Sequence, residues 1–115
     1  MNTKEPGNGA RFADGDILLA RHSLNPQIRF AIGTVEGNDK KADKVQLRLL
    51  HVLRAWGNDG HQRPDARFVQ AANAGLGNYS EFQRADVMKL SEEDFIAALP
   101  LSASELAAKF FPSPV

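Results

Sequence analysis

Between residues 17 and 87, the apolar side chains come in short segments that turn-forming residues interrupt every few positions. Residues 17–21 are one such segment, after the turn at residues 14–16. Residues 28–35 alternate with a period of two, which is typical of a strand. Residues 45–54 begin with the same alternation. Two more short strands are predicted over residues 67–70 and 79–87.

Two of these segments break their own pattern. Gly33 lies inside the second predicted strand, where glycine suggests a bulge or a tight bend. In the third, Val45, Leu47 and Leu49 alternate with polar residues, and the apolar phase then passes to Leu50 and Val52. Such a change of phase marks a bulge or a stretch buried on both faces.

The last 25 residues have a different pattern, because they contain two sequences typical of a helix N-terminus. Ser91 precedes three acidic residues, and Ser102 precedes Glu105 at capping-box spacing. Pro100 and Pro112 end the two segments. We therefore expect helices near residues 92–99 and 103–111.

These elements predict a mainly β chain with C-terminal helices, an α+β arrangement. Five short, strongly curved strands fit a small SH3-like or OB-like barrel. A helical tail at about residues 91–111 would close one open mouth or edge of that barrel. Residues 1–13 are expected to be a flexible N-terminal arm with Phe12 as its only anchor. Residues 14–115 then form a single domain.

Composition removes several classes of function. The chain has 115 residues and no cysteine, which excludes disulfides, Cys-based zinc sites and thiol nucleophiles. The three histidines lack metal-ligand spacing, and no phosphate-binding loop is present, so no metal or cofactor is expected. The start has no secretory pattern and no apolar run is long enough for a membrane span. A soluble, cytoplasmic protein is the expectation.

Charge argues mildly against a dedicated nucleic-acid binder. The 14 basic and 14 acidic residues cancel, whereas such binders usually carry a basic excess. The halves differ, however. Residues 1–70 hold 11 basic and 8 acidic residues, a net charge of +3, and residues 71–115 hold 3 and 6, a net charge of −3.

The candidate site residues are arginines of the strands and aromatic or basic residues of the loops. Arg29 and Arg48 fall on the polar faces of the second and third strands, so they would present two guanidinium groups on one surface if those strands pair. Trp56 and Tyr79 flank glycine-containing loops, where aromatic side chains typically anchor a partner. The predicted partner-binding residues are Arg29, Arg48, Trp56, His61, Arg63 and Tyr79.

Residues 15–21 (GDILLAR) followed by residues 29–35 (RFAIGTV) resemble the opening of SH3-like barrels. Both Tudor-type binding modules and MazF/PemK-type toxin ribonucleases begin this way. In the toxins a polar strand and a helix come later, which residues 83–90 and the capped tail echo. The resemblance places Arg29 at the family's catalytic strand-two arginine. Phe30 stands where that family has proline, residues 49–53 lack its Thr/Ser motif, and the chain has too few aromatics for a Tudor-type cage.

Two functions remain open. The first is a non-catalytic binding or inhibitor module, an accessory protein that recognises another macromolecule, a protein before a nucleic acid. The alternative is an RNA-binding or RNA-cleaving barrel, a metal-independent ribonuclease that uses Arg29, Arg48 and His51. A homodimer or larger structural oligomer is a third possibility, which light scattering would reveal.

Overall fold

A computed structural model describes residues 12–36, 43–54 and 66–112 of the chain. Over these residues the chain is mainly β with a few short helices, which confirms the predicted class. The strands are β1 (Ile17–Arg21), β2 (Ile28–Val35), β3 (Lys44–Arg54), β4 (Val69–Gln70), β5 (Tyr79–Gln83) and β6 (Val87–Lys89). The helices are α1 (Ala71–Ala74), the 3-10 helix η1 (Arg84–Asp86), α2 (Glu92–Ala98) and α3 (Ala103–Phe110).

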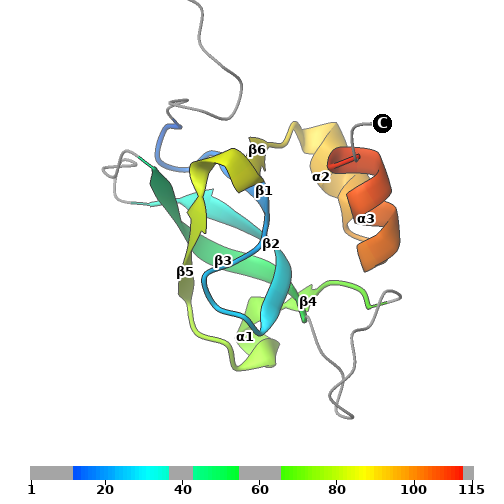
Figure 1. Cartoon of the computed structure of the whole chain (residues 1–115), viewed down its shortest axis with the longest axis horizontal. Helices are drawn as coiled ribbons and strands as arrows, with labels where there is room; N and C mark the ends of the chain where they lie inside the picture. The colour runs from blue at the N-terminus through cyan, green and yellow to red at the C-terminus, as the bar shows by residue number, and fades with distance from the viewer. Residues whose placement is uncertain (1–11, 37–42, 55–65, 113–115) are drawn as a thin grey trace, which may run out of the picture.

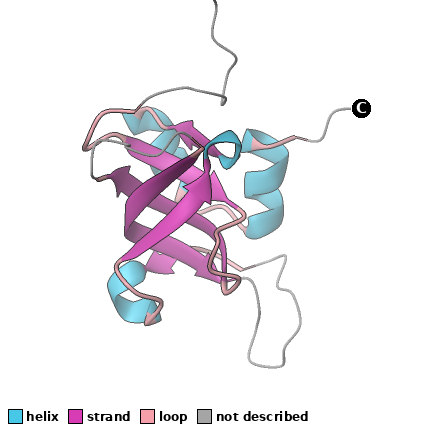
Figure 2. Ribbon diagram, turned by 60° about the vertical axis from the view of Figure 1, so that its left-hand side comes forward, coloured by secondary structure: helices cyan, strands magenta, loops and turns pink. Residues whose placement is uncertain are grey.

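The strands form one antiparallel sheet in the order β4-β3-β2-β1-β6, and β5 also pairs with β3. β1 is therefore an interior strand, between β2 and β6. Figure 2 shows that the sheet bends, so that strands in front cross those behind. The pairing of the described strands leaves the sheet open, so closure into a barrel stays a prediction.

Two apolar clusters occupy the two faces of this sheet. The first fills the inside of the bend, where Leu47, Val52 and Phe82 pack with α1, and Phe12 packs against it as predicted. The second lies between β1, β2 and β3 and the C-terminal helices, with Leu19, Ile32 and Leu106 fully buried. Helices α2 and α3 thus cover a face of the sheet (Figure 1), whereas the sequence suggested that they close a mouth or an edge.

The strand irregularities predicted from the sequence are present. The β2–β3 register shifts between Ile32 and Gly33, where Leu50 is the extra residue on β3. Val52 then faces the first cluster and Leu53 the second, so this stretch is buried on both faces. A second shift lies between Ile28 and Phe30. It turns Ile28 into the first cluster, away from Phe30, although strict alternation would put both on one face.

The C-terminal helices begin where the sequence places them. The Ser91 hydroxyl accepts from the Asp94 N–H, and Ser102 and Glu105 form a complete capping box. Leu106 is buried and Phe110 packs beside it in the second cluster, as the spacing of four residues predicts. Both helices end within one residue of the expected positions.

The region between β3 and α2 departs from prediction. The single strand expected over residues 79–87 is two strands separated by η1, because Arg84 turns inward and donates to the Lys44 carbonyl. Of the strand expected over residues 67–70, only β4 forms. A glycine-rich loop is expected over residues 73–78, but its first residues belong to α1, which ends at Gly75 in the left-handed conformation.

Candidate functional site

Strand β3 changes its partner halfway along one edge. Lys44–Arg48 pairs with β5, whereas His51 and Val52 pair with β4. Between these ladders the Leu49 N–H donates to the Asn78 carbonyl at 2.8 Å, and the bulge residue Leu50 follows. Two strands that leave one edge in different directions open a gap in the sheet surface. We call this place the β3 fork.

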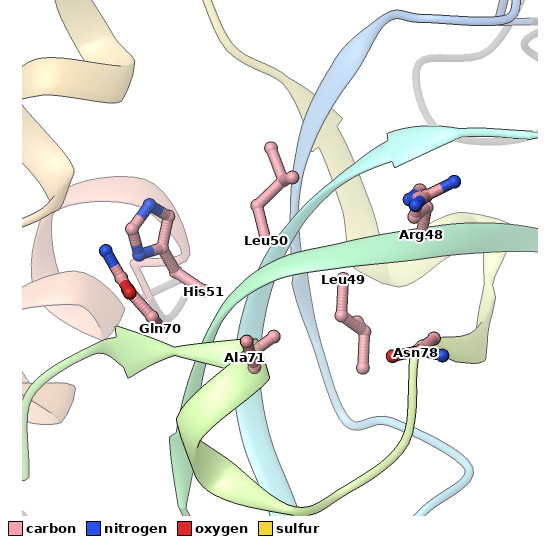
Figure 3. A pocket seen from close by; sticks show the side chains of 8 residues that line it. Arg48, Leu49, Leu50, His51, Gln70, Ala71 and Asn78 are labelled. Carbon is pink, nitrogen blue, oxygen red and sulfur yellow. The ribbon is translucent and has the colours of Figure 1, made fainter.

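A pocket of about 410 Å³ lies at the β3 fork, within the size range of ligand-binding clefts. Helix α1 borders it, and the Arg54 guanidinium fixes α1 by donating to the Ala74 carbonyl. Figure 3 shows Arg48 and Leu50 on the same side of β3, with His51 beside Gln70. The lining residues are Arg48, Leu49, Leu50, His51, Gln70, Ala71, Ala72 and Asn78.

Exposed apolar side chains lie on the strands of the fork, and Leu50 among them lines the pocket. Leu50, Val69 and Tyr79 are each more than a third exposed, and they lie on β3, β4 and β5, the three strands of the fork. Large apolar groups left in water around a concave, partly polar site are a common mark of an interaction surface. This combination makes the β3 fork the candidate functional site.

His51 forms one wall of the pocket and contacts the helical layer. Its ring lies 6.1 Å from the Phe95 ring of α2, with the planes tilted by 51°. Partial burial lowers the pKa of His51 from its ordinary value of 6.5, because removal from water disfavours the charged imidazolium. The imidazole is therefore neutral at pH 7.

This burial predicts a measurable pH dependence. The folded state releases the His51 proton more readily than the unfolded state does, so stability falls as the pH drops through 6.5 towards the lower folded pKa. An NMR titration should give a pKa below 6.5 for His51, and Phe95→Ala should move it back towards 6.5. A His51 pKa at or above 6.5 would contradict the packing of this ring.

Arg48, Tyr79 and Glu36 form a polar cluster beside the pocket. Arg48 and Tyr79 are register partners on β3 and β5. The Tyr79 hydroxyl is hydrogen-bonded to Glu36, and this bond with the Glu36 charge raises the pKa of Tyr79. Arg48 Nη1 lies 3.7 Å from Glu36 Oε2, too far for a hydrogen bond. Glu36 therefore interacts with both Tyr79 and Arg48.

The structure separates the residues that the sequence grouped together. β2 and β3 do pair, but Arg29 is five residues from Thr34, the register partner of Arg48, roughly 16 Å at about 3.3 Å per residue. The Arg29 guanidinium lies over the Phe30 ring, which stacks on Phe111. Arg48 and His51 line the same pocket, and Arg29 does not.

Other candidates have different outcomes. Tyr79 stands at the rim of the β3 fork and is 45% exposed. Trp56, His61 and Arg63 lie outside the described residues. Sequence reasoning missed Glu36, Leu50, Gln70 and Asn78. Of these four residues, only Leu50 is marked in the sequence, because the apolar phase of β3 changes there.

Over the described residues, no cluster of three or more histidine, aspartate or glutamate side chains could hold a metal ion. No helix in that part of the chain is long and apolar enough to cross a membrane. Comparison with protein-family models, curated proteins and solved structures finds no match to this chain.

Proposed function

We propose that this chain is a non-catalytic binding module that recognises another protein through the β3 fork. The observation that carries the proposal is the pocket itself, which exposed Leu50 lines, with exposed Tyr79 on β5 next in sequence to the lining residue Asn78. Tyrosine and arginine are the residue types most enriched at the energetic centres of protein interfaces, and Tyr79 and Arg48 are neighbours here.

The scaffold proposed for this module is a small SH3-like barrel. Support comes from the strand order, in which β1 pairs with β2 on one side and with β6, the last strand, on the other. β6 is the outer strand on that side of the sheet, and closure into a barrel would require it to pair with β5 at the other side. Such a scaffold holds the strands of the fork rigidly, and rigid elements position binding groups more precisely than loops do.

A second candidate, RNA binding or cleavage, has one observation in its favour. Arg48 and His51 line the same pocket, and a guanidinium beside a neutral imidazole could bind a phosphate and accept a proton. Against it, Arg48 is the only cationic side chain among the lining residues, whereas nucleic-acid affinity grows with the number of neutralised phosphates. Protein recognition is therefore the first proposal.

An affinity capture from the source cell's lysate, run with and without nuclease, tests this function. Wild type, Leu50→Ala, Tyr79→Ala and the matched control Ile96→Ala serve as baits, and mass spectrometry identifies what they retain. Ile96 is 63% exposed on α2 and does not line the pocket. We expect a protein retained by wild type and the control after nuclease treatment. The two fork variants should lose it, since a hot-spot truncation costs about 2 kcal/mol or more.

Two results would contradict the proposal. Equal retention by all four baits would place the binding surface elsewhere. Loss of every specific partner on nuclease treatment would favour the RNA alternative. In that case cleavage assays on His51→Gln, Arg48→Gln and Arg29→Ala, each checked for folding by circular dichroism, would decide which of these residues the chemistry uses.

A further inference from the structure

The charge in the lining of the pocket at the β3 fork is positive. Among the described residues that line it, Arg48 is the only cation and none is acidic. Its other polar groups are the amides of Gln70 and Asn78 and the imidazole of His51, which partial burial keeps neutral. A concave surface with one guanidinium, two amides and no carboxylate complements an anion that accepts hydrogen bonds.

The Arg48 guanidinium does not form a short hydrogen bond with Glu36, the acidic residue beside it. At 3.7 Å, Glu36 attracts Arg48 without a short hydrogen bond, and both side chains are exposed enough for water to screen the pair. Tyr79 interacts with the same carboxylate, so Glu36 is shared between two side chains. Arg48 can therefore bind a second carboxylate in the bidentate geometry that guanidinium favours.

The surroundings of the guanidinium favour a peptide over a nucleic acid. Leu50 is exposed and lies on the same side of β3 as Arg48 (Figure 3). Leu50 suits an apolar side chain of a peptide, whereas single-stranded nucleic acids are bound by stacking successive bases on several aromatic rings, and Tyr79 is one exposed ring at this rim. The charge of the whole chain balances, so no general basic field attracts a polyanion.

From these observations we propose that the β3 fork binds an acidic, partly apolar peptide segment of the partner, with its Asp or Glu carboxylate on Arg48 and an apolar side chain against Leu50. Glu36 is an internal competitor for Arg48, and the partner's carboxylate takes its place. This inference rests on the proposed function and adds the chemistry of the ligand.

The test uses the opposite effects expected from the two members of one ion pair. Random peptides displayed on phage are selected on the full-length protein, and the binding constants of enriched peptides are then measured for wild type, Arg48→Gln and Glu36→Gln. We expect enrichment of Asp and Glu beside apolar residues. Arg48→Gln should weaken binding by about tenfold or more, since it removes a charge-assisted hydrogen bond. Glu36→Gln should strengthen binding by about threefold, because it removes an exposed competing charge.

A purely structural role for the ion pair predicts something different, because either variant breaks the same pair and would shift affinity in the same direction. Lys89→Gln is the charge control. It removes one positive charge from β6, where Lys89 lies near Asp16, and should leave affinity unchanged. Urea unfolding of each variant confirms that the fold is retained.

Each remaining outcome contradicts a specific part of the account. Peptides selected without acidic residues, yet weakened by Leu50→Ala, would overturn the carboxylate inference and leave the binding module standing. Equal or same-direction effects of Arg48→Gln and Glu36→Gln would do the same. Failure to select any peptide, together with Arg48-dependent binding of a single-stranded RNA oligonucleotide, would overturn the inference and the proposed function together.

Discussion

Gly33→Ala is expected to lower the free energy of unfolding by about 3 kcal/mol, although it adds a single methyl group. A Cβ at this position would lie 2.5 Å from the Arg48 carbonyl oxygen and 3.1 Å from the Leu47 Cβ. The oxygen belongs to the backbone of β3, so it cannot rotate away as a side chain would. Relief would require β2 and β3 to separate beside the bulge that forms the β3 fork.

Gly75→Ala is the matched control for this substitution. Gly75 has a φ of 72°, but no atom lies within 4 Å of its added Cβ. Its replacement therefore costs only the strain of the left-handed conformation, about 1 kcal/mol. Urea unfolding of both variants makes the comparison. If Gly33→Ala lowers the free energy of unfolding by no more than Gly75→Ala does, β2 and β3 do not approach each other as closely as described.

Leu106→Ala should lower the free energy of unfolding by about 3 kcal/mol, because it leaves a cavity between α3 and the sheet. Leu106 is fully buried in the second cluster, with Leu19 of β1 and Ile32 of β2. For a domain of this size the loss corresponds to a drop in Tm of roughly 12 °C. A loss this large would establish that the C-terminal helices fold together with the sheet.

Ile96→Ala is the control for Leu106→Ala, since it also shortens an aliphatic side chain in the helical layer. Ile96 is mostly exposed, so its truncation should change stability by no more than about 0.5 kcal/mol. Calorimetry on both variants gives the two Tm values. Similar values, close to wild type, would mean that α3 is a loosely attached tail.

Local patterns predicted the elements whose causes are local. The alternation of residues 28–35 and the apolar run of residues 17–21 gave β2 and β1 with their observed bounds. Ser91 and Ser102 marked helix starts because a capping hydroxyl needs only its own first turn. The change of phase at Leu50 indicated the β3 bulge, since side-chain direction in a strand depends on counting alone.

The elements that were missed depend on contacts distant in sequence. The break between β5 and β6 exists because Arg84 reaches the Lys44 carbonyl, 40 residues away. α1 has four residues, too few to be stable alone, and the Arg54 guanidinium binds its last carbonyl. A local sequence pattern does not indicate hydrogen-bond partners that are distant along the chain.

The candidate site was predictable only in part, for the same reason. Arg48, His51 and Tyr79 stood out by residue type. Their meeting with Gln70 and Asn78 depends on β4 and β5 sharing one edge of β3. Arg29 was grouped with Arg48 because both are polar residues of paired strands. The register, which sets their separation along the sheet, becomes visible only in the structure.

Site-specific photocrosslinking in the source cell tests directly whether the β3 fork contacts a protein partner. A benzoylphenylalanine replaces Leu50 in one version of the chain and Ile96 in another. Both positions are exposed and aliphatic, and only Leu50 lines the pocket. We expect a discrete crosslinked protein from position 50 and none from position 96. A crosslink from position 96 alone, or from neither position, would contradict this expectation.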